Sequence, residues 1–264
     1  MEAGCHTYAF RGLDRPRVLA LLPVLGFRRL ELWAGHAPFA EGIRRAGDIA
    51  AEIAAQGLEI TAYSIGGLFG LPLAVVEERV ARALAFARAL GTAVVTGIAD
   101  RAAVPRIDAL AAREDMRFGL ENHWYTEFAR PADYAPVLAD ASPAIGVAID
   151  TGHFAFLGLD LAAVARTLGP RAVDVHVKVV RPENALARLL RRRARRFHMN
   201  PALPGPDDQL DRFLPALAAT GYAGPLVVEH EDGEAPDAHA LLYRARLAPL
   251  LADTAASPAE ALHV

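Results

Sequence analysis

Four side chains that could hold a metal ion follow four successive apolar runs between residues 116 and 230 of the chain. Glu121 stands in "GLENH", Asp150 in "AIDTGH", His176 in "DVHVK" and Glu229 in "VVEHE". Three carboxylates and one imidazole form an oxygen-rich set that suits a hard or borderline divalent cation such as Mn²⁺, Mg²⁺ or Co²⁺, with Zn²⁺ also compatible. Their spacing along the chain is no metal signature, so the hypothesis requires a fold that brings the four together.

Each residue also has an ordinary structural explanation. A lone carboxylate at a strand end is often a helix cap or half of an ion pair, and a lone histidine between valines is often a hydrogen-bonded core residue. A buried strand that ends on Glu121 is harder to explain, because burying an unpaired carboxylate is costly. A cation at the strand end would offset that desolvation.

Eight short apolar runs alternate with longer amphipathic stretches. Alternation of this kind predicts a parallel sheet, and eight units favour a closed (β/α)8 TIM barrel over a doubly wound open sheet. We expect one α/β domain over 1–252 and a loose tail over 253–264. The predicted strands are Cys5–Phe10, Arg28–Trp33, Leu58–Ser64, Thr92–Gly97, Met116–Asn122, Ala144–Asp150, Ala172–Lys178 and Pro225–His230; the helical patterns are 15–25, 38–56, 74–90, 102–113, 131–140, 161–168, 207–220 and 237–252.

The ends of these strands explain why distant residues could meet. In a barrel, catalytic groups from several strands gather at the carboxyl ends of the strands. Residues two apart share a strand face, so Glu121 should point with His123, and His176 with Lys178. The second predicted strand also ends on a carboxylate, Glu31 in "LELW".

Composition narrows the class of protein. The chain has 264 residues, 53% of them hydrophobic, which is enough for one large core. The N-terminus lacks a signal-peptide pattern, no long apolar run predicts a membrane span, and Cys5 is the single cysteine, so we expect a cytoplasmic protein without internal disulfides. The net charge of −3 disfavours nucleic acid as a partner.

The motifs resemble the xylose isomerase-like superfamily of TIM barrels, in particular its sugar phosphate isomerase/epimerase branch. "LEN", "DTGH", "VHVK" and "GYAGPLVVEHE" carry the resemblance in this order, from about residue 4 to 250. The resemblance implies one divalent metal ion, most readily Mn²⁺, bound by Glu121, Asp150, His176 and Glu229. It also implies that Glu121 and Glu229 transfer protons next to a carbonyl through a metal-bound enediolate.

The same site would permit several reactions. Returning the proton to the other face is epimerisation, returning it to the neighbouring carbon is isomerisation, and expelling a hydroxyl is dehydration. We expect a sugar or keto-polyol isomerase or epimerase, with a lyase that dehydrates an inosose-like ketone as the alternative. An abasic-site endonuclease is less favoured, because "TAYSIGG" and "TAVVTGI" lack the histidines of its metal cluster. A non-catalytic binding barrel is disfavoured by the intact ligand set.

Further residues are candidates for substrate binding. By resemblance to ketose 3-epimerases, Glu127 and His153 would contact substrate oxygens; the arginine of those enzymes is replaced by Pro182, with Arg181 one position earlier. Lys178, on the face of His176, joins this set. Trp33 and Trp124 could pack against a sugar ring and His6 could line the pocket; packing at the barrel rim is the alternative for all three. His123 could orient a ligand or serve as a buried hydrogen-bonded residue.

Residues 181–203 form an insertion with an arginine-rich amphipathic pattern. It could be a solvated face, a subunit contact or a lid that meets an acidic substrate group; a nucleic-acid patch is disfavoured by the acidic remainder. Apolar helix faces leave room for a homodimer.

Overall fold

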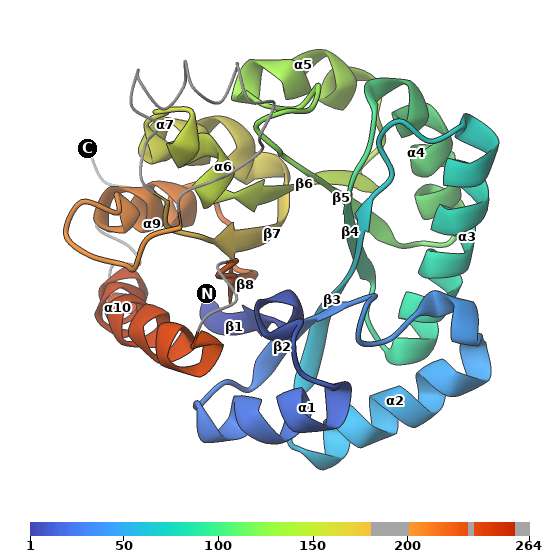
Figure 1. The fold of residues 1–264 in the computed structure, drawn as a ribbon. Coiled ribbons are helices and arrows are strands. Elements are labelled where there is room, and N and C mark those ends of the chain that lie inside the picture. Colours follow the sequence, from blue (N-terminus) through green and yellow to red (C-terminus); the bar gives the residue numbers. More distant parts are fainter. Residues whose placement is uncertain (181–200, 232–234, 257–264) are drawn as a thin grey trace, which may run out of the picture.

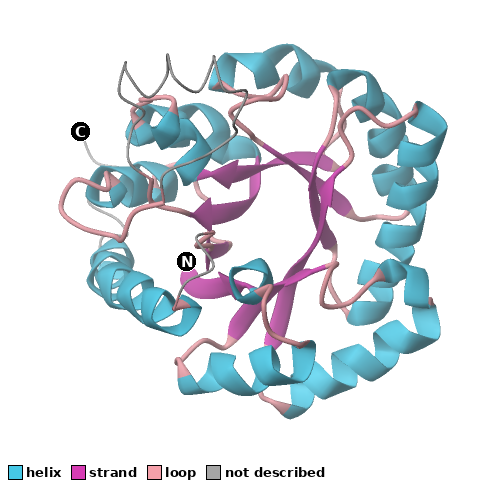
Figure 2. Ribbon diagram, viewed as in Figure 1, coloured by secondary structure: helices cyan, strands magenta, loops and turns pink. Residues whose placement is uncertain are grey.

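The eight predicted strands form a closed parallel barrel in the order of the sequence, β1 to β8, with β8 pairing back to β1. The computed structural model describes residues 1–180, 201–231 and 235–256. The helices form an outer ring around the strands (Figures 1 and 2). The fold is therefore the predicted single-domain (β/α)8 barrel. The strands are β1 Glu2–His6, β2 Arg29–Trp33, β3 Glu59–Gly67, β4 Val94–Ile98, β5 Arg117–Glu121, β6 Ile145–Asp150, β7 Ala172–Val177 and β8 Pro225–Val228.

Helices connect consecutive strands, as the amphipathic patterns predict. They are α1 Arg15–Val24, α2 Ile43–Ala55, α3 Leu73–Leu90, α4 Val104–Arg113, α5 Pro131–Asp140, α6 Thr151–Phe156, α7 Leu161–Leu168, α9 Leu210–Ala218 and α10 Pro236–Ala256. Short 3-10 turns are η1 Thr7–Phe10, η2 Phe39–Glu41, η3 Arg101–Ala103 and η4 Gly169–Arg171. Among the described helices, none is long and apolar enough to cross a membrane.

Helix α3 illustrates how the pattern determines the packing. Its buried residues recur at helical spacing and include Val76, Val80, Leu84 and Ala87, so one face lies against the barrel. The helix ends at Gly91, whose φ of 89° is left-handed and free of steric cost only for glycine. The predicted helix over 74–90 is thus confirmed to within one residue.

The structure corrects two predicted boundaries near the termini. The first strand is Glu2–His6 rather than Cys5–Phe10, because Thr7–Phe10 turns into η1, where the Nδ1 of His6 accepts a hydrogen bond from the amide of Tyr8. At the other end, α10 continues to Ala256, four residues into the segment predicted to be loose. The rest of that tail, 257–264, lies outside the described residues.

Most of the predicted insertion, residues 181–200, also lies outside the described residues, and so does its predicted amphipathic helix. The described chain on either side of it is brought together: Val180 pairs with Pro201 in an antiparallel bridge, and the amide of Ala202 donates to the carbonyl of Val179. The insertion therefore leaves and rejoins the barrel beside the carboxyl end of β7.

Candidate metal centre

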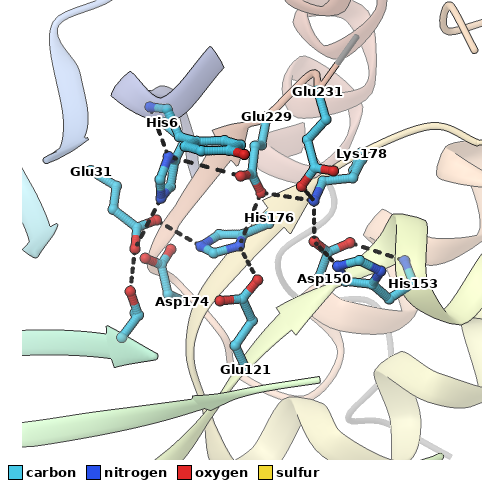
Figure 3. Close-up of polar contacts among 12 residues, drawn as sticks. His6, Glu31, Glu121, Asp150, His153, Asp174, His176, Lys178, Glu229 and Glu231 are labelled. Atoms are coloured by element: carbon cyan, nitrogen blue, oxygen red, sulfur yellow. Dashed lines mark hydrogen bonds and ion pairs between the residues drawn. The ribbon is translucent and has the colours of Figure 1, made fainter. Parts of the chain in front are cut away.

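The four predicted ligands meet at the carboxyl ends of neighbouring strands. Glu121 is the last residue of β5, Asp150 ends β6, His176 is the penultimate residue of β7, and Glu229 directly follows β8. One ligand atom from each residue lies within 4.8 Å of those of the other three. All four side chains are buried (Figure 3). Residues that are far apart in the sequence thus form a single compact cluster in the fold.

His176 is the centre of this cluster. Its Nδ1 lies 3.6 Å from Oε1 of Glu121 and 3.5 Å from Oε2 of Glu229. Its Nε2 lies 2.7 Å from Oε2 of Glu31, the middle residue of β2. The hydroxyl of Thr96 on β4 donates to the other oxygen of Glu31. Glu31 therefore holds one ring nitrogen of His176 and directs the other toward the ligand carboxylates.

The electrostatics of His176 fit a metal ligand. Although burial opposes it, the carboxylates of Glu31 and Glu121 raise the pKa of His176 well above its usual value. Among these carboxylates the ring favours a proton on both nitrogens. A cation bound at Nδ1 would displace the proton on Nδ1. The proton on Nε2, which is directed at Glu31, would stay. Glu31 itself stays ionised: against the effect of burial, His176 and His6 lower its pKa to about 2.

The two proposed proton-transfer groups differ in electrostatic environment. Burial raises the pKa of Glu121, and the neighbouring charges of Glu229 and Asp150 add to this. For Glu229 burial acts in the same direction, but Lys178 and His6 outweigh it and lower the pKa. The two carboxylates therefore lie in different electrostatic environments although they share one site.

Lys178 is a buried cation beside the ligands. Its Nζ lies 2.7 Å from Oδ2 of Asp150, 3.0 Å from Oε2 of Glu229 and 2.6 Å from Oε1 of Glu231. Its aliphatic stem passes over Gly152, where an added Cβ would lie 2.7 Å from Cγ of the lysine. The glycine of "DTGH" is therefore what gives the lysine room to reach the carboxylates.

A pocket of about 300 Å³ opens over this cluster. Two of the candidate ligands, Glu121 and Glu229, reach its wall. The other residues that line it are His6, Tyr8, Trp33, Ser64, Gly66, Gly67, Ile98, His123, His153 and Glu231. Tyr8 and Trp33 meet edge to face with ring centroids 5.0 Å apart, which gives the pocket wall an aromatic part beside its polar groups. This mixture suits a small polyhydroxylated molecule.

The structure brings some of the other predicted residues to the pocket and places others elsewhere. His6, Trp33 and His153 line it, and the ring of His153 lies 3.7 Å from that of His123. Lys178 does not line the pocket itself but contacts Glu229 and Glu231, which do. Glu127 and Trp124 do not line the pocket either.

Glu127 is exposed, and its carboxylate accepts a hydrogen bond from the amide of Arg101. It lies just after a turn in which the amide of Thr126 donates to the carbonyl of His123. Trp124 packs against the core at the barrel rim, with its ring 5.2 Å from that of Phe156. Arg181 lies outside the described residues. The predicted substrate contacts of Glu127 and Trp124 thus have no support from their positions.

Sequence reasoning assigned no role to three residues of the cluster. Glu31 was visible as a strand-end carboxylate, but its partner was not. Glu231 is two residues beyond Glu229 in "EHE", so the shared strand face was an available signal. Asp174 lies two residues before His176, fully buried; burial and the neighbouring Glu31 raise its pKa well above the usual value. Its place two residues before His176, on the same strand face, was the available signal in the sequence.

These donors fit a divalent cation. Three carboxylates and one imidazole nitrogen are brought within reach of one ion, and the Nδ1 of His176 makes no hydrogen bond within the described chain. A second group, His6, Glu31 and His176, also clusters. There the Nε2 of His176 already contacts Glu31, so that group is better described as the support of the first.

Solved structures share this fold. The probable 3-DHS dehydratase AsbF from Bacillus anthracis superposes with a TM-score of 0.73 at 18% identity, over 95% of this chain and 99% of that one. An L-ribulose 3-epimerase gives 0.76 at 20% identity, over 97% and 96%. IOLI protein with a binding zinc atom gives 0.74 at 14% identity, over 96% and 98%. No curated protein matches this chain. Identities this low show the fold alone.

Fold and site together define a (β/α)8 barrel with a cluster of carboxylates and histidine at the carboxyl ends of its strands. Enzymes with this fold carry their active sites at that end of the barrel. The family follows from the sequence itself. A family model described as the xylose isomerase-like TIM barrel matches residues 19–247, and this chain belongs to that family.

Proposed function

We propose that this protein is a divalent-metal-dependent isomerase or epimerase of a sugar or keto-polyol. The observation that carries the proposal is the convergence of Glu121, Asp150, His176 and Glu229 on one point beneath a polar pocket. A divalent cation there would supply Lewis-acid stabilisation of negative charge that develops on the substrate oxygens. Mn²⁺ is the ion we favour, and Mg²⁺, Co²⁺ and Zn²⁺ suit the same donors.

The protein's own residues would carry the proton. Glu121 and Glu229 both reach the pocket wall and approach His176 from different strands, so they can face a substrate from two sides. One carboxylate removes the proton next to the carbonyl and the other returns it, to the same carbon or to its neighbour. His153 and Trp33, on the pocket wall, would orient the substrate. The carbanionic character that develops is the reason why a nearby cation is needed.

Exchange in D₂O tests this proposal. The Mn²⁺-loaded protein, incubated with candidate ketoses, should introduce deuterium next to the carbonyl, as read by NMR. Glu121→Gln and Glu229→Gln should each reduce that exchange by about 10²-fold or more, since general acid–base groups contribute about 10²–10⁴-fold. The matched control Glu59→Gln changes an exposed carboxylate at the amino end of β3, which pairs with Arg29. Exchange at the parent rate in both site variants would remove the two-glutamate mechanism.

A dehydratase of a keto-polyol is the second candidate. The observation that favours it is His123, which lines the pocket beside His153 and could donate a hydrogen bond to a departing hydroxyl while Glu121 or Glu229 supplies the proton that leaves with it as water. Burial, followed by the charge of Lys178, lowers the pKa of His123 to about 4, so the neutral ring prevails at pH 7. A conjugated enone that appears with loss of water, followed by its ultraviolet absorbance, would favour the dehydratase over the isomerase.

An abasic-site endonuclease is a weaker candidate, because its metal cluster would need histidines at the ends of the third and fourth strands. The β3 and β4 part of the pocket wall is formed by Ser64, Gly66, Gly67 and Ile98, without a histidine among these described residues. A homodimer, a cytoplasmic location and the lack of a nucleic-acid partner stay predictions from the sequence.

A further inference from the structure

Glu231 stands between the pocket and the buried cation Lys178. It lines the pocket, and Oε1 lies 2.6 Å from the lysine Nζ (Figure 3). Its side chain keeps 29% exposure, whereas that of Lys178 keeps 2%. The other two partners of the ammonium, Asp150 and Glu229, are in the metal-ligand cluster. Glu231 is therefore the one of the three that the ligand set does not require.

Three carboxylates surround the ammonium of Lys178. All of them lie within 3.0 Å of its Nζ, and among them Glu231 accepts a hydrogen bond from it. A substrate carboxylate that approached the lysine from the pocket would compete with Glu231. The two in the ligand cluster are needed at the metal site, so the replaceable partner is Glu231.

The backbone of Glu231 is also fixed. Arg11 donates from Nη2 to the Glu231 carbonyl over 2.7 Å, while its guanidinium lies 4.8 Å from the centre of the Tyr8 ring. These contacts hold the end of the β8 segment against the pocket wall. The Arg11 contact thus anchors the backbone from which the Glu231 side chain reaches the lysine.

Apart from a bound cation, the charged side chains on the described pocket wall are carboxylates. Glu121, Glu229 and Glu231 line it, and none of the described lining residues is a lysine or arginine. An incoming anion would face Glu231 in a partly buried setting, where like charges repel more strongly than in water.

We propose that Glu231 is a specificity-determining residue. It occupies the pocket side of Lys178, so the pocket accepts uncharged polyhydroxylated substrates and disfavours substrates that carry a carboxylate. This inference rests on the proposed function for the location of the substrate site. It names the feature that separates a neutral ketose or inosose from a keto-acid of the same ring size.

A matched pair of ligands tests it. Quinate is a polyhydroxylated ring acid, and methyl quinate is its uncharged ester. Isothermal titration of the Mn²⁺-loaded protein should show at least tenfold tighter binding of the ester. Glu231→Gln removes the charge at constant size, and Glu231→Ala also opens space at the lysine. Both should gain at least tenfold in quinate affinity, with ester affinity within threefold of the parent. Glu59→Gln, at the far end of the barrel, should behave as the parent.

Ester binding also reports that each variant is folded. A parent protein without preference for the ester, or variants without a gain in quinate affinity, would overturn the role of Glu231. Binding needs no turnover, so the outcome is separable from the exchange test. A protein that shows this preference but no deuterium exchange loses the proposed proton transfer and keeps the role of Glu231.

Discussion

His176 illustrates at the scale of one residue how buried polar groups create a metal ligand. Its ring lies between Glu31 on one side and Glu121 and Glu229 on the other. Of the two ring nitrogens, the one that contacts Glu31 is committed to a hydrogen bond, which leaves Nδ1 for a cation. Partners of this kind fix the tautomer and orientation of a metal-binding histidine.

Replacing Glu31 should therefore weaken metal binding without removing a ligand. Glu31→Gln keeps an acceptor for His176 and a partner for Thr96 but loses the charge, and Glu31→Ala loses both. We expect Mn²⁺ affinity to fall by about 10–100-fold in Glu31→Ala and by less in Glu31→Gln. Competition with a fluorescent chelator measures this. Glu2→Gln, an exposed carboxylate paired with Arg29, is the control. Equal affinities in all three variants would refute the positioning role.

A second prediction at this scale concerns His36 and acid. Burial lowers the pKa of His36, and its Nε2 lies 3.1 Å from the carbonyl of Leu13. The unfolded chain therefore takes up a proton at a higher pH than the folded one, and stability is lost as the pH falls below the usual histidine pKa of about 6.5. His36→Gln can still donate to Leu13 but does not titrate.

Urea unfolding at pH 7, 6 and 5 measures the effect. The free energy of unfolding should fall less steeply with acid in His36→Gln than in the parent, while the two should run parallel from pH 8 to 7. Parallel curves over the whole range would show that His36 is not a source of the acid sensitivity.

At the scale of elements, the turn from β6 into α6 places three functions in four residues. Asp150 is a candidate metal ligand, and its Oδ1 also caps α6 by accepting from the amide of His153. Gly152, between them, lets the stem of Lys178 pass. The sequence "DTGH" thus contains a helix cap at Asp150, room for the lysine stem at Gly152 and a pocket residue at His153.

Gly152→Ala should break this arrangement. The new Cβ would lie within 2.8 Å of three stem carbons of Lys178, so the lysine must move away from its carboxylates. Overpacking of this kind costs about 1–3 kcal/mol in the free energy of unfolding. The matched control is Gly47→Ala inside α2, where nothing lies within 4 Å of the new Cβ. That change should stabilise the protein by about 0.5–1 kcal/mol. Equal effects of the two substitutions in urea unfolding would contradict the packing argument.

The sequence predicts strand ends well and strand register poorly, for a physical reason. Apolar runs and the residues that follow them identify Glu121, Asp150, His176 and Glu229, because these lie where parallel strands finish. The pairing of β6 with β7 shifts between Val147 and Ala148, and only after that shift does Asp150 stand opposite His176. Such irregularities redirect side chains near active sites but leave no mark in a period-two pattern.

The contacts of individual side chains are less predictable still. Glu31 meets His176 across 145 positions of sequence, which no local pattern encodes. Glu127 has the spacing expected of a substrate ligand, yet its carboxylate accepts from the amide of Arg101. Strand ends follow from hydrophobic burial, whereas loop direction follows from hydrogen bonds that the fold decides.

At the scale of the whole molecule, the candidate ligand cluster joins the last four strands of the barrel. Its residues come from β5, β6 and β7 and from the segment after β8, and β8 closes the barrel by pairing with β1. An unfolded chain would scatter these ligands, so a cation that binds them should favour the folded state.

Metal binding and global unfolding should therefore be coupled. At a free Mn²⁺ concentration of about 100 times Kd, binding adds about 2.7 kcal/mol to the free energy of unfolding. For a chain of this size, that raises Tm by roughly 5–10 °C. Asp150→Asn is the sharpest comparison, because asparagine can still cap α6 at His153 but contributes no charge to the ion. Its Tm at the same Mn²⁺ concentration should rise by less than half as much, and chelator should cancel the rise in both proteins. A parent protein whose Tm ignores Mn²⁺, or a variant that responds equally, would mean that the four strand ends do not share an ion.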